Sequence, residues 1–184
     1  MTTPPNTARH IIPQLDHGKR YRTRGVVIHV MDGPTIGGCI AWWSRRGNKV
    51  GAHLMVDNAR CVQAVDLDHV AWHAPGDNMA DPGAQSGNYE FIGIEHTGFG
   101  TDSYVRWIAR RKQRVISANR TAWILYHYRC GVPKWGHNVV RHSEFSRTTH
   151  KMCPGPGFPV KLYMMAVNRA YRNLVKSRGK SWSR

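Results

Sequence analysis

The stretch Gly25-Val26-Val27-Ile28-His29-Val30 predicts a buried strand. The run is apolar and rich in β-branched residues, and a glycine bounds it, which is the composition of a strand packed inside a sheet. One histidine, His29, stands near the end of the run. Because a strand end is among the most rigid positions in a fold, a metal ligand placed there is held firmly.

The segments that follow this strand predict an α/β fold. We expect a helix over 34–46, a hairpin of strands 52–57 and 61–65, a loop over 74–90, a strand over 91–97, a long basic helix that starts after 102 or 103 and ends before Gly131, a short strand over 138–141 and a last helix from 159 to about 176. This order favours a central mixed β-sheet flanked by helices. A length of 184 residues fits one domain. We expect a single domain over 1–184, with its core at about 22–176 and a basic tail at 177–184.

A second stretch, closer to the C-terminus, carries metal-binding residue types. Arg141-His142-Ser143-Glu144 and Lys151-Met152-Cys153-Pro154-Gly155 place a histidine, a lysine and a cysteine in one loop. An imidazole nitrogen and a cysteine sulfur are strong zinc ligands, and three protein ligands with one open position are typical of a catalytic zinc. With His29 as the third ligand, the sequence predicts one catalytic Zn²⁺ per chain.

Six short motifs follow one another between about residues 25 and 160. They are Val27-Ile28-His29, Gly51-Ala52-His53-Leu54-Met55-Val56-Asp57, Ala71-Trp72-His73-Ala74, Ile92-Gly93-Ile94-Glu95, Val140-Arg141-His142-Ser143 and Lys151-Met152-Cys153-Pro154-Gly155-Pro156-Gly157-Phe158. In this order they resemble the zinc-dependent N-acetylmuramoyl-L-alanine amidases, the superfamily that includes phage endolysins and the peptidoglycan recognition proteins. The resemblance implies that His29, His142 and Cys153 bind zinc and that Glu95 and Lys151 complete the active site. It also implies the substrate, the amide between the lactyl group of N-acetylmuramic acid and L-alanine of the stem peptide.

The chain departs from part of this family at two positions. Some members carry a tyrosine on the strand after the first helix, where this chain has Ala52. That difference puts a tyrosine-assisted mechanism in doubt and leaves more weight on Glu95. Other members have an aspartate as the third ligand, so Cys153 resembles the cysteine-bearing subset.

The residues themselves suggest how an amide would be hydrolysed. Glu95 ends an apolar strand-like run, where a carboxylate should have a raised pKa and can pass a proton to the leaving amine. Lys151 would face the oxygen that gains negative charge, and one such donor contributes about 2.7 to 4 kcal/mol of barrier lowering. Trp72 and His73 either line the substrate groove or pack the hairpin, and the sequence leaves both possibilities open.

Most of the 11 histidines receive no functional role. His53 and His96 are adjacent to motif residues, but alternation along a strand points neighbours to opposite faces. His150 is interpreted as an ordinary surface or core residue. Three cysteines are expected to be free thiols that pack as small apolar side chains, namely Cys39, Cys61 and Cys130.

A formal net charge of +16 and a pI near 10.4 indicate attraction to polyanions. Nucleic acid and an anionic cell envelope both fit this charge, as does a solvated basic face. No helix-turn-helix, zinc-finger or RNA-recognition signature accompanies it, so we expect no nucleic-acid partner. Attraction to teichoic acids or other anionic wall polymers is a hypothesis. The sequence has no apolar run of transmembrane length and no Sec signal peptide is evident.

These features favour a monomeric phage endolysin whose partner is bacterial peptidoglycan. Such a protein is made in the host cytoplasm and acts on the cell wall after release. One alternative is a cytoplasmic amidase that recycles muropeptides, although an enzyme acting on small soluble fragments has no evident need of so large a charge. A second alternative is a peptidoglycan-binding module without activity, against which the full set of ligand and catalytic residue types argues.

Overall fold

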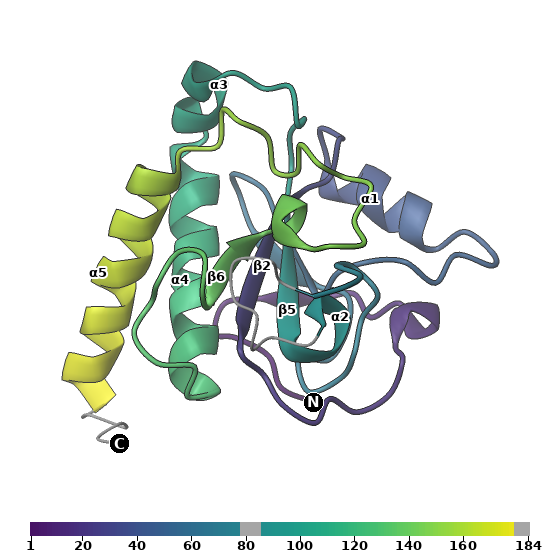
Figure 1. Cartoon of the computed structure of the whole chain (residues 1–184), viewed down its shortest axis with the longest axis horizontal. Coiled ribbons are helices and arrows are strands. Elements are labelled where there is room, and N and C mark those ends of the chain that lie inside the picture. The colour runs from purple at the N-terminus through teal and green to yellow at the C-terminus, as the bar shows by residue number, and fades with distance from the viewer. Residues whose placement is uncertain (78–85, 179–184) are drawn as a thin grey trace.

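The computed structural model describes residues 1–77 and 86–178, which fold around one mixed β-sheet (Figure 1). The six strands lie in the order β1-β4-β3-β5-β2-β6. The pair β3 and β4 is antiparallel, and the other neighbouring pairs are parallel. The strands are β1 (Ala8–Arg9), β2 (Gly25–Val30), β3 (Leu54–Val56), β4 (Cys61–Gln63), β5 (Phe91–His96) and β6 (Val139–Arg141). The α/β architecture with a central mixed sheet confirms the predicted fold class.

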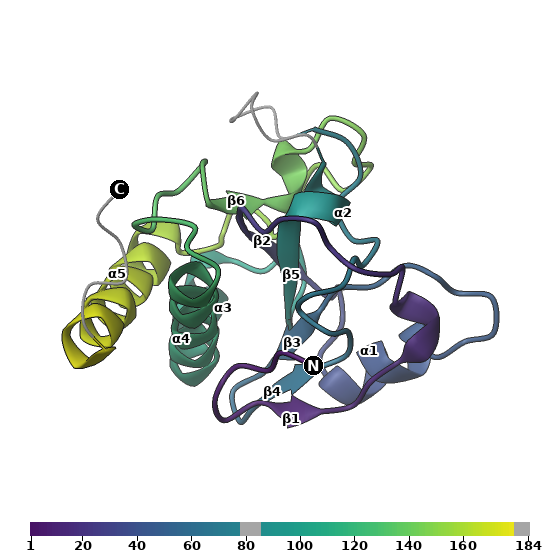
Figure 2. The ribbon, with the colours of Figure 1, turned by 90° about the horizontal axis from the view of Figure 1, so that it is seen from below.

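Helices cover both faces of this sheet. They are α1 (Ile36–Trp43), α2 (Gly87–Glu90), α3 (Tyr104–Ala109), α4 (Arg111–His127) and α5 (Val160–Arg178), with two 3-10 turns, η1 (Pro13–Leu15) and η2 (His142–Glu144). The helices α4 and α5 pack side by side against one face, and α1 lies on the other side of the molecule (Figure 2). Within the described ranges no helix has the length and apolar character needed to cross a membrane.

Alternation along β2 and β5 sorts their side chains between the two faces of the sheet. Val26, Ile28 and Ile94 belong to the apolar cluster that includes α4 and α5. His29 is the register partner of Glu95, because β2 and β5 run parallel. Both of these side chains line a pocket on the side of α1. The sheet therefore places a candidate ligand and a candidate acid–base group next to each other.

The observed elements differ from the expected ones at several boundaries, and the expected loop over 74–90 ends in the helix α2. The long basic helix is divided at Arg110, whose ψ of 52° is not helical and whose guanidinium lies 2.7 Å from the Asp102 carboxylate. The packed core extends beyond the boundary expected near residue 22, because Ile12 and Leu15 are buried in the cluster that contains α1 residues. Residues 177 and 178 of the expected tail continue α5, and the rest of that tail, 179–184, lies outside the described residues.

Candidate active site

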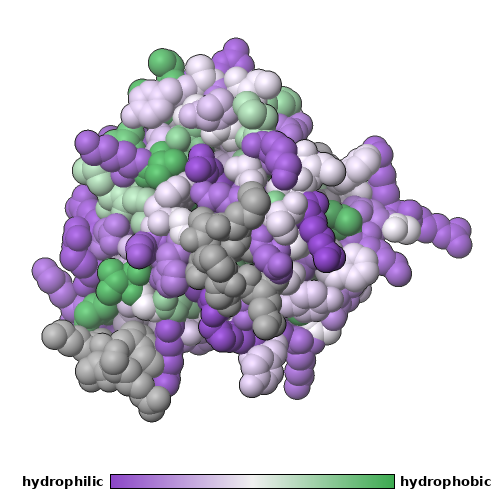
Figure 3. All heavy atoms as spheres, in the orientation of Figure 1, coloured by the Kyte–Doolittle hydropathy of each residue, from purple (hydrophilic) through white to green (hydrophobic). Residues whose placement is uncertain are grey.

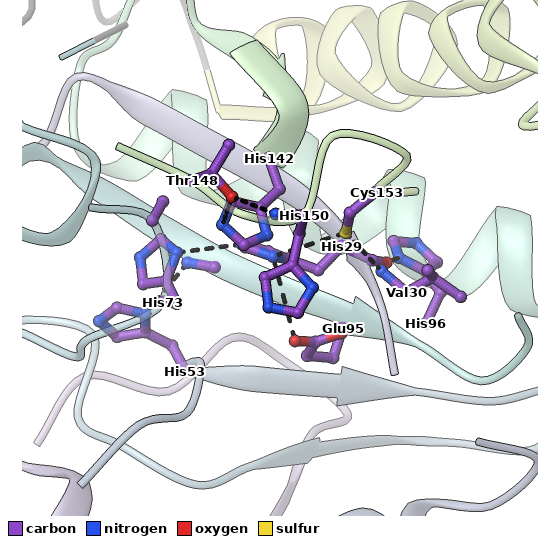
Figure 4. Close-up of polar contacts among 12 residues, drawn as sticks. His29, Val30, His53, His73, Glu95, His96, His142, Thr148, His150 and Cys153 are labelled. Atoms are coloured by element: carbon purple, nitrogen blue, oxygen red, sulfur yellow. Dashed lines mark hydrogen bonds and ion pairs between the residues drawn. The ribbon is translucent and has the colours of Figure 1, made fainter. Parts of the chain in front are cut away.

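Three residues expected to bind metal come together at the carboxyl end of β2 (Figure 4). His29 belongs to β2, His142 opens η2 directly after β6, and Cys153 lies in the turn that follows. Their ligand atoms all lie within 4.8 Å of one another, and all three side chains are buried. The Nδ1 atom of His29 is 3.9 Å from the sulfur of Cys153. Such spacing suits donors that share one ion.

Neighbouring groups fix the orientation of two of these donors. The hydroxyl of Thr148 lies 2.9 Å from Nε2 of His142. The backbone N–H of Val30 donates to the sulfur of Cys153 at 3.3 Å. Partners of this kind hold a ligand in one rotamer and, for an imidazole, in one tautomer.

A further histidine, His73, orients His29 by contacting the ring nitrogen that faces away from Cys153. Its Nε2 lies 3.1 Å from the carbonyl oxygen of Phe91, and its Nδ1 lies 3.0 Å from Nε2 of His29. Burial lowers the pKa of His73 to about 3, so the ring is neutral. Because a carbonyl oxygen only accepts, His73 carries its hydrogen on Nε2 and accepts a hydrogen bond from His29 at Nδ1. The lone pair of His29 is then on Nδ1, the nitrogen closest to Cys153 and Glu95.

A glycine in β5 makes room for the ring of His73. A Cβ atom at Gly93 would lie 2.9 Å from Cγ of His73 and 2.8 Å from Cβ of Ala52, closer than packed side chains approach. Asn88 of α2 holds the backbone next to this ring, since its side-chain oxygen accepts from the N–H groups of His73 and Ala74 at 2.7 and 2.6 Å. The small residues at 52 and 93 thus belong to the support of the ligand cluster.

Glu95 lies beside His29, and one of its carboxylate oxygens lacks a donor among the described residues. Its Oε1 is 4.0 Å from Nδ1 of His29, and the side chain is 15% exposed. Its Oε2 is buried and receives no hydrogen bond from the described residues. Burial, with a smaller contribution from the charge of Asp32, raises the pKa of Glu95 to about 8. A buried carboxylate oxygen without a donor is costly, so this atom is suited to a water or a substrate group in the pocket.

The donor set fits a zinc ion. Burial lowers the pKa of His29 well below its usual range and that of His142 to about 3, and an imidazole must be neutral to act as a ligand. Burial and the charge of Glu95 raise the pKa of the Cys153 thiol well above its usual range. A divalent cation at the sulfur reverses that effect, because it favours the thiolate. Two nitrogens and one sulfur leave one of the four zinc positions for another ligand.

A pocket of about 540 Å³ adjoins these donors. Its lining includes Glu95, Asp32 after β2, and Trp42 on α1. The Trp42 ring is exposed, and the guanidinium of Arg45 lies 4.4 Å from its centre. A pocket of this size with a few converging polar groups is typical of a site for a small ligand or one segment of a polymer.

Not every residue expected at the site lines this pocket. Lys151 is exposed and is not one of the lining residues, although its charge contributes to the lowered pKa of His142. Trp72 also lies outside the lining and stacks on His17 with the ring centres 3.8 Å apart. His73 lines the pocket, but its ring is buried and its nitrogens are used by Phe91 and His29.

Sequence reasoning missed His150, which lines the pocket and stacks on His142 with the ring centres 5.2 Å apart. It lies on an irregular loop, where no periodicity predicts the direction of a side chain. Its place between two expected ligands, three residues before Cys153, was the one available signal.

Comparisons with known proteins agree with this geometry. A family model described as N-acetylmuramoyl-L-alanine amidase matches residues 19–156. The N-acetylmuramoyl-L-alanine amidase A of Achromobacter lyticus is 32% identical over 165 residues, which cover 80% of this chain and 84% of the relative. The solved structure of the Staphylococcus aureus hydrolase AmiA superposes with a TM-score of 0.71 at 19% identity, covering 98% of this chain and 90% of that one. The amidase LysC from Clostridium intestinale superposes with a TM-score of 0.62 at 17% identity, covering 90% and 99%.

The two solved structures support the fold, and the family match and the 32% identical relative support the class of enzyme. The matched range contains all six motifs up to Pro156, and the resemblance that those motifs predict is confirmed. The chain therefore belongs to the N-acetylmuramoyl-L-alanine amidase family and is an enzyme of that class.

Proposed function

We propose that this amidase is a zinc enzyme that cleaves the amide between N-acetylmuramic acid and the L-alanine of the peptidoglycan stem peptide. The observation that carries the proposal is the meeting of two neutral imidazoles, one thiol and a buried carboxylate in a single pocket. His29, His142 and Cys153 would hold one Zn²⁺ per chain. Zinc, when bound, supplies Lewis acidity, which lowers the pKa of a bound water to about 7 and polarises a carbonyl oxygen.

Glu95 moves the proton in this proposal. Its Oε1 lies on the side of the ligand cluster, and its Oε2 has no donor among the described residues. The carboxylate takes a proton from the water that attacks the amide carbon, and it returns that proton to the nitrogen as the carbon–nitrogen bond breaks. The products are a carboxyl group on the lactyl ether and a free amino group on L-alanine.

The oxygen that gains negative charge needs a donor, and two neighbouring residues of one loop are candidates. We assign this role to Lys151, whose long flexible side chain carries a cationic group close enough to contribute to the lowered pKa of His142. His150, at the pocket itself, is the second candidate. A single donor at a developing oxyanion contributes about 2.7 to 4 kcal/mol, so substitution of each residue separates them.

Within this class we propose an endolysin that acts on the intact wall as a monomer. It would be made in a host cytoplasm and reach peptidoglycan after release. The support is the net charge of +16, which suits a cell wall that carries anionic polymers. A muropeptide-recycling amidase would prefer soluble fragments. Faster release of amino groups from intact sacculi than from soluble muropeptides therefore supports the endolysin. Faster release from the soluble muropeptides overturns it.

The release of free amino groups from purified peptidoglycan, with zinc measured in the same protein sample, tests the proposed chemistry. We expect one zinc per chain, activity that is lost with a chelator, and recovery on addition of zinc. Activity that persists in zinc-free protein contradicts the zinc proposal. Binding to sacculi without release of amino groups indicates the non-catalytic binding module instead.

A further inference from the structure

The net positive charge of this chain lies in its second part. Residues 1–102 contain 9 Lys and Arg and 10 Asp and Glu, whereas residues 103–184 contain 18 Lys and Arg and a single acidic residue, Glu144. The first part therefore has a formal charge of −1 and the second part +17, which together give the +16 of the whole chain. Solubility alone does not require the cations and anions to be separated along the chain in this way.

The helix α5 arranges part of this charge as a ridge. The ridge is defined as Lys161, Arg169, Arg172 and Lys176, and all four side chains are exposed. At about 100° per residue these positions fall within roughly 80° of the helix circumference, and at 1.5 Å per residue they extend over about 22 Å. The helix contains no acidic residue. The ridge is thus a line of cations along one side of a helix.

Within the described residues, the four cations of the ridge do not contribute to the stability of the fold through packing or ion pairs. The opposite side of α5 packs into the apolar core through Tyr163, Val167 and Tyr171. In the part of the chain that the structure describes, none of the ridge residues forms an ion pair. Like charges along one helix face repel and reduce its stability slightly. The ridge therefore costs stability, and a ligand that neutralises it would remove that cost.

The ridge is also separated from the pocket. In both ribbon views α5 and α1 lie at opposite sides of the molecule (Figures 1 and 2), and α1 contributes to the wall of the pocket. The pocket lining contains no residue of α5. A polymer bound along the ridge would leave the pocket open to a second polymer.

The surroundings of the ridge favour one kind of polyanion. Met165 is the one well-exposed large apolar side chain of α5, and the face drawn in Figure 3 has scattered small hydrophobic patches rather than one broad patch. An interfacial helix needs an apolar face to insert into lipid. Single-stranded nucleic acid is held by aromatic stacking as well as charge, and both tyrosines of α5 are buried. What remains is attraction to a flexible chain of charges without bases or acyl groups.

We propose that the α5 ridge is a docking face for a linear phosphodiester polymer attached to the bacterial wall. The proposal rests on the proposed function, because a wall hydrolase meets such polymers beside its substrate. The helix lies along the polymer, and the four cations displace counterions from successive phosphates. The amidase is then held near peptidoglycan while its pocket stays free.

Binding of the zinc-loaded chain to soluble poly(glycerol phosphate) tests the ridge. One variant removes its charges, Lys161→Gln, Arg169→Gln, Arg172→Gln and Lys176→Gln, with glutamine chosen because its helix propensity is close to that of lysine and arginine. The control variant removes the same charge from exposed positions of the first part, Arg9→Gln, Lys19→Gln, Arg46→Gln and Arg60→Gln. Both variants have the same net charge.

We expect the ridge variant to bind the polymer at least tenfold more weakly than the control variant. If the ridge neutralises four phosphates, with the slope of about −0.7 per phosphate that single strands show, binding of the unmodified chain weakens roughly 50-fold between 50 and 200 mM salt. The ridge variant should lose most of this dependence. Equal binding by the two variants overturns the proposal. Tighter binding to anionic phospholipid vesicles or to single-stranded DNA, at equal phosphate concentration, also overturns it.

Amidase activity on soluble muropeptides separates this inference from the proposed function. The ridge variant should retain that activity, because the ridge is remote from the pocket. Failure of the unmodified chain to release amino groups would remove the proposed function while the polymer-binding result stood. Unchanged polymer binding by the ridge variant would remove the docking face and leave the activity in place.

Discussion

Two polar residues of β5, His96 and Glu95, lie on opposite faces of the sheet and differ in their hydrogen bonds. Towards α4 and α5, His96 is fully partnered, with Nδ1 2.8 Å from the carbonyl oxygen of His29 and Nε2 2.7 Å from the hydroxyl of Ser117. That hydroxyl continues to Tyr163 at 2.9 Å. Towards α1, Glu95 has an oxygen beside the ligand cluster that no donor in the described part of the chain reaches. For these two residues, the complete set of partners around His96 suits packing, and the available oxygen of Glu95 beside the ligand cluster suits chemistry.

Loss of a metal ligand on the face of the sheet towards α1 should have the largest effect on zinc content and activity. We expect His29→Ala and Cys153→Ser to lower bound zinc from one per chain to near zero and to reduce the hydrolysis rate by more than about 10⁴-fold. Metal analysis and an amino-group release assay measure both. The matched control is Cys39→Ser, which changes a thiol that lines the same pocket but lies outside the ligand cluster. Equal zinc loss in this control would contradict the assignment of Cys153.

Removal of the Glu95 carboxylate tests whether this residue is an acid–base group or a fourth metal ligand. We expect Glu95→Gln to retain zinc and to lose about 10²- to 10⁴-fold in kcat, because the amide cannot accept the proton of the attacking water. Zinc content and kcat are measured on the same preparation. A variant that loses its zinc would show that Glu95 belongs to the metal site.

The two candidate oxyanion donors should differ in size of effect. Lys151→Ala is expected to lower kcat by about 10²- to 10³-fold, the usual result of removing one such donor, and His150→Ala by no more than about tenfold. The comparison of kcat for the two variants decides between them. A larger loss for His150→Ala would transfer the role to the residue that lines the pocket in this structure.

Loss of His73, which orients His29, should weaken zinc binding less than loss of His29 itself. His73→Leu removes the acceptor for His29 and should weaken zinc binding by about 10- to 100-fold, measured by competition with a chelator. His73→Asn can place an oxygen near the position of Nδ1 and should recover most of the affinity. The control is His53→Asn, a change at a second buried histidine, whose ring centre lies 5.3 Å from that of His73 and whose hydrogen bonds within the described residues do not involve His29. Equal loss in the control would mean that the effect comes from packing.

A substitution on the face of the sheet towards α4 and α5 should change the stability of the protein and leave its activity unchanged. Tyr163 is fully buried, and its hydroxyl lies 2.9 Å from Ser117 and 2.7 Å from Thr121. Tyr163→Phe removes that hydroxyl, so we expect the free energy of unfolding to fall by about 1 to 3 kcal/mol. Zinc affinity and kcat should not change. Urea denaturation gives the first quantity, and a change in kcat would contradict the separation of the two faces.

The main strands and the clustering of His29, His142 and Cys153 could be predicted because the strand pattern and the family motifs are visible in the sequence. The apolar run of β2 and the order of the motifs are visible in the sequence, and parallel pairing then brings His29 beside Glu95. Alternation along β5 also predicts that His96 points away from Glu95, and its hydrogen bond to Ser117 on α4 agrees.

Other features depend on contacts that no local pattern carries. The role of His73 follows from which ring nitrogen meets which neighbour, and that geometry needs the space left by Gly93. The exposure of Lys151 follows from the path of an irregular loop. The break before α4 occurs at Arg110, which also forms an ion pair with Asp102, and neither feature has a signal in the helical periodicity.

X-ray absorption at the zinc edge tests the central claim, the identity of the metal ligands, most directly. With zinc bound to the intact chain we predict one sulfur neighbour at about 2.3 Å and nitrogen or oxygen neighbours at about 2.0 to 2.2 Å. A zinc site without sulfur, or with two sulfurs, would contradict the site built from His29, His142 and Cys153.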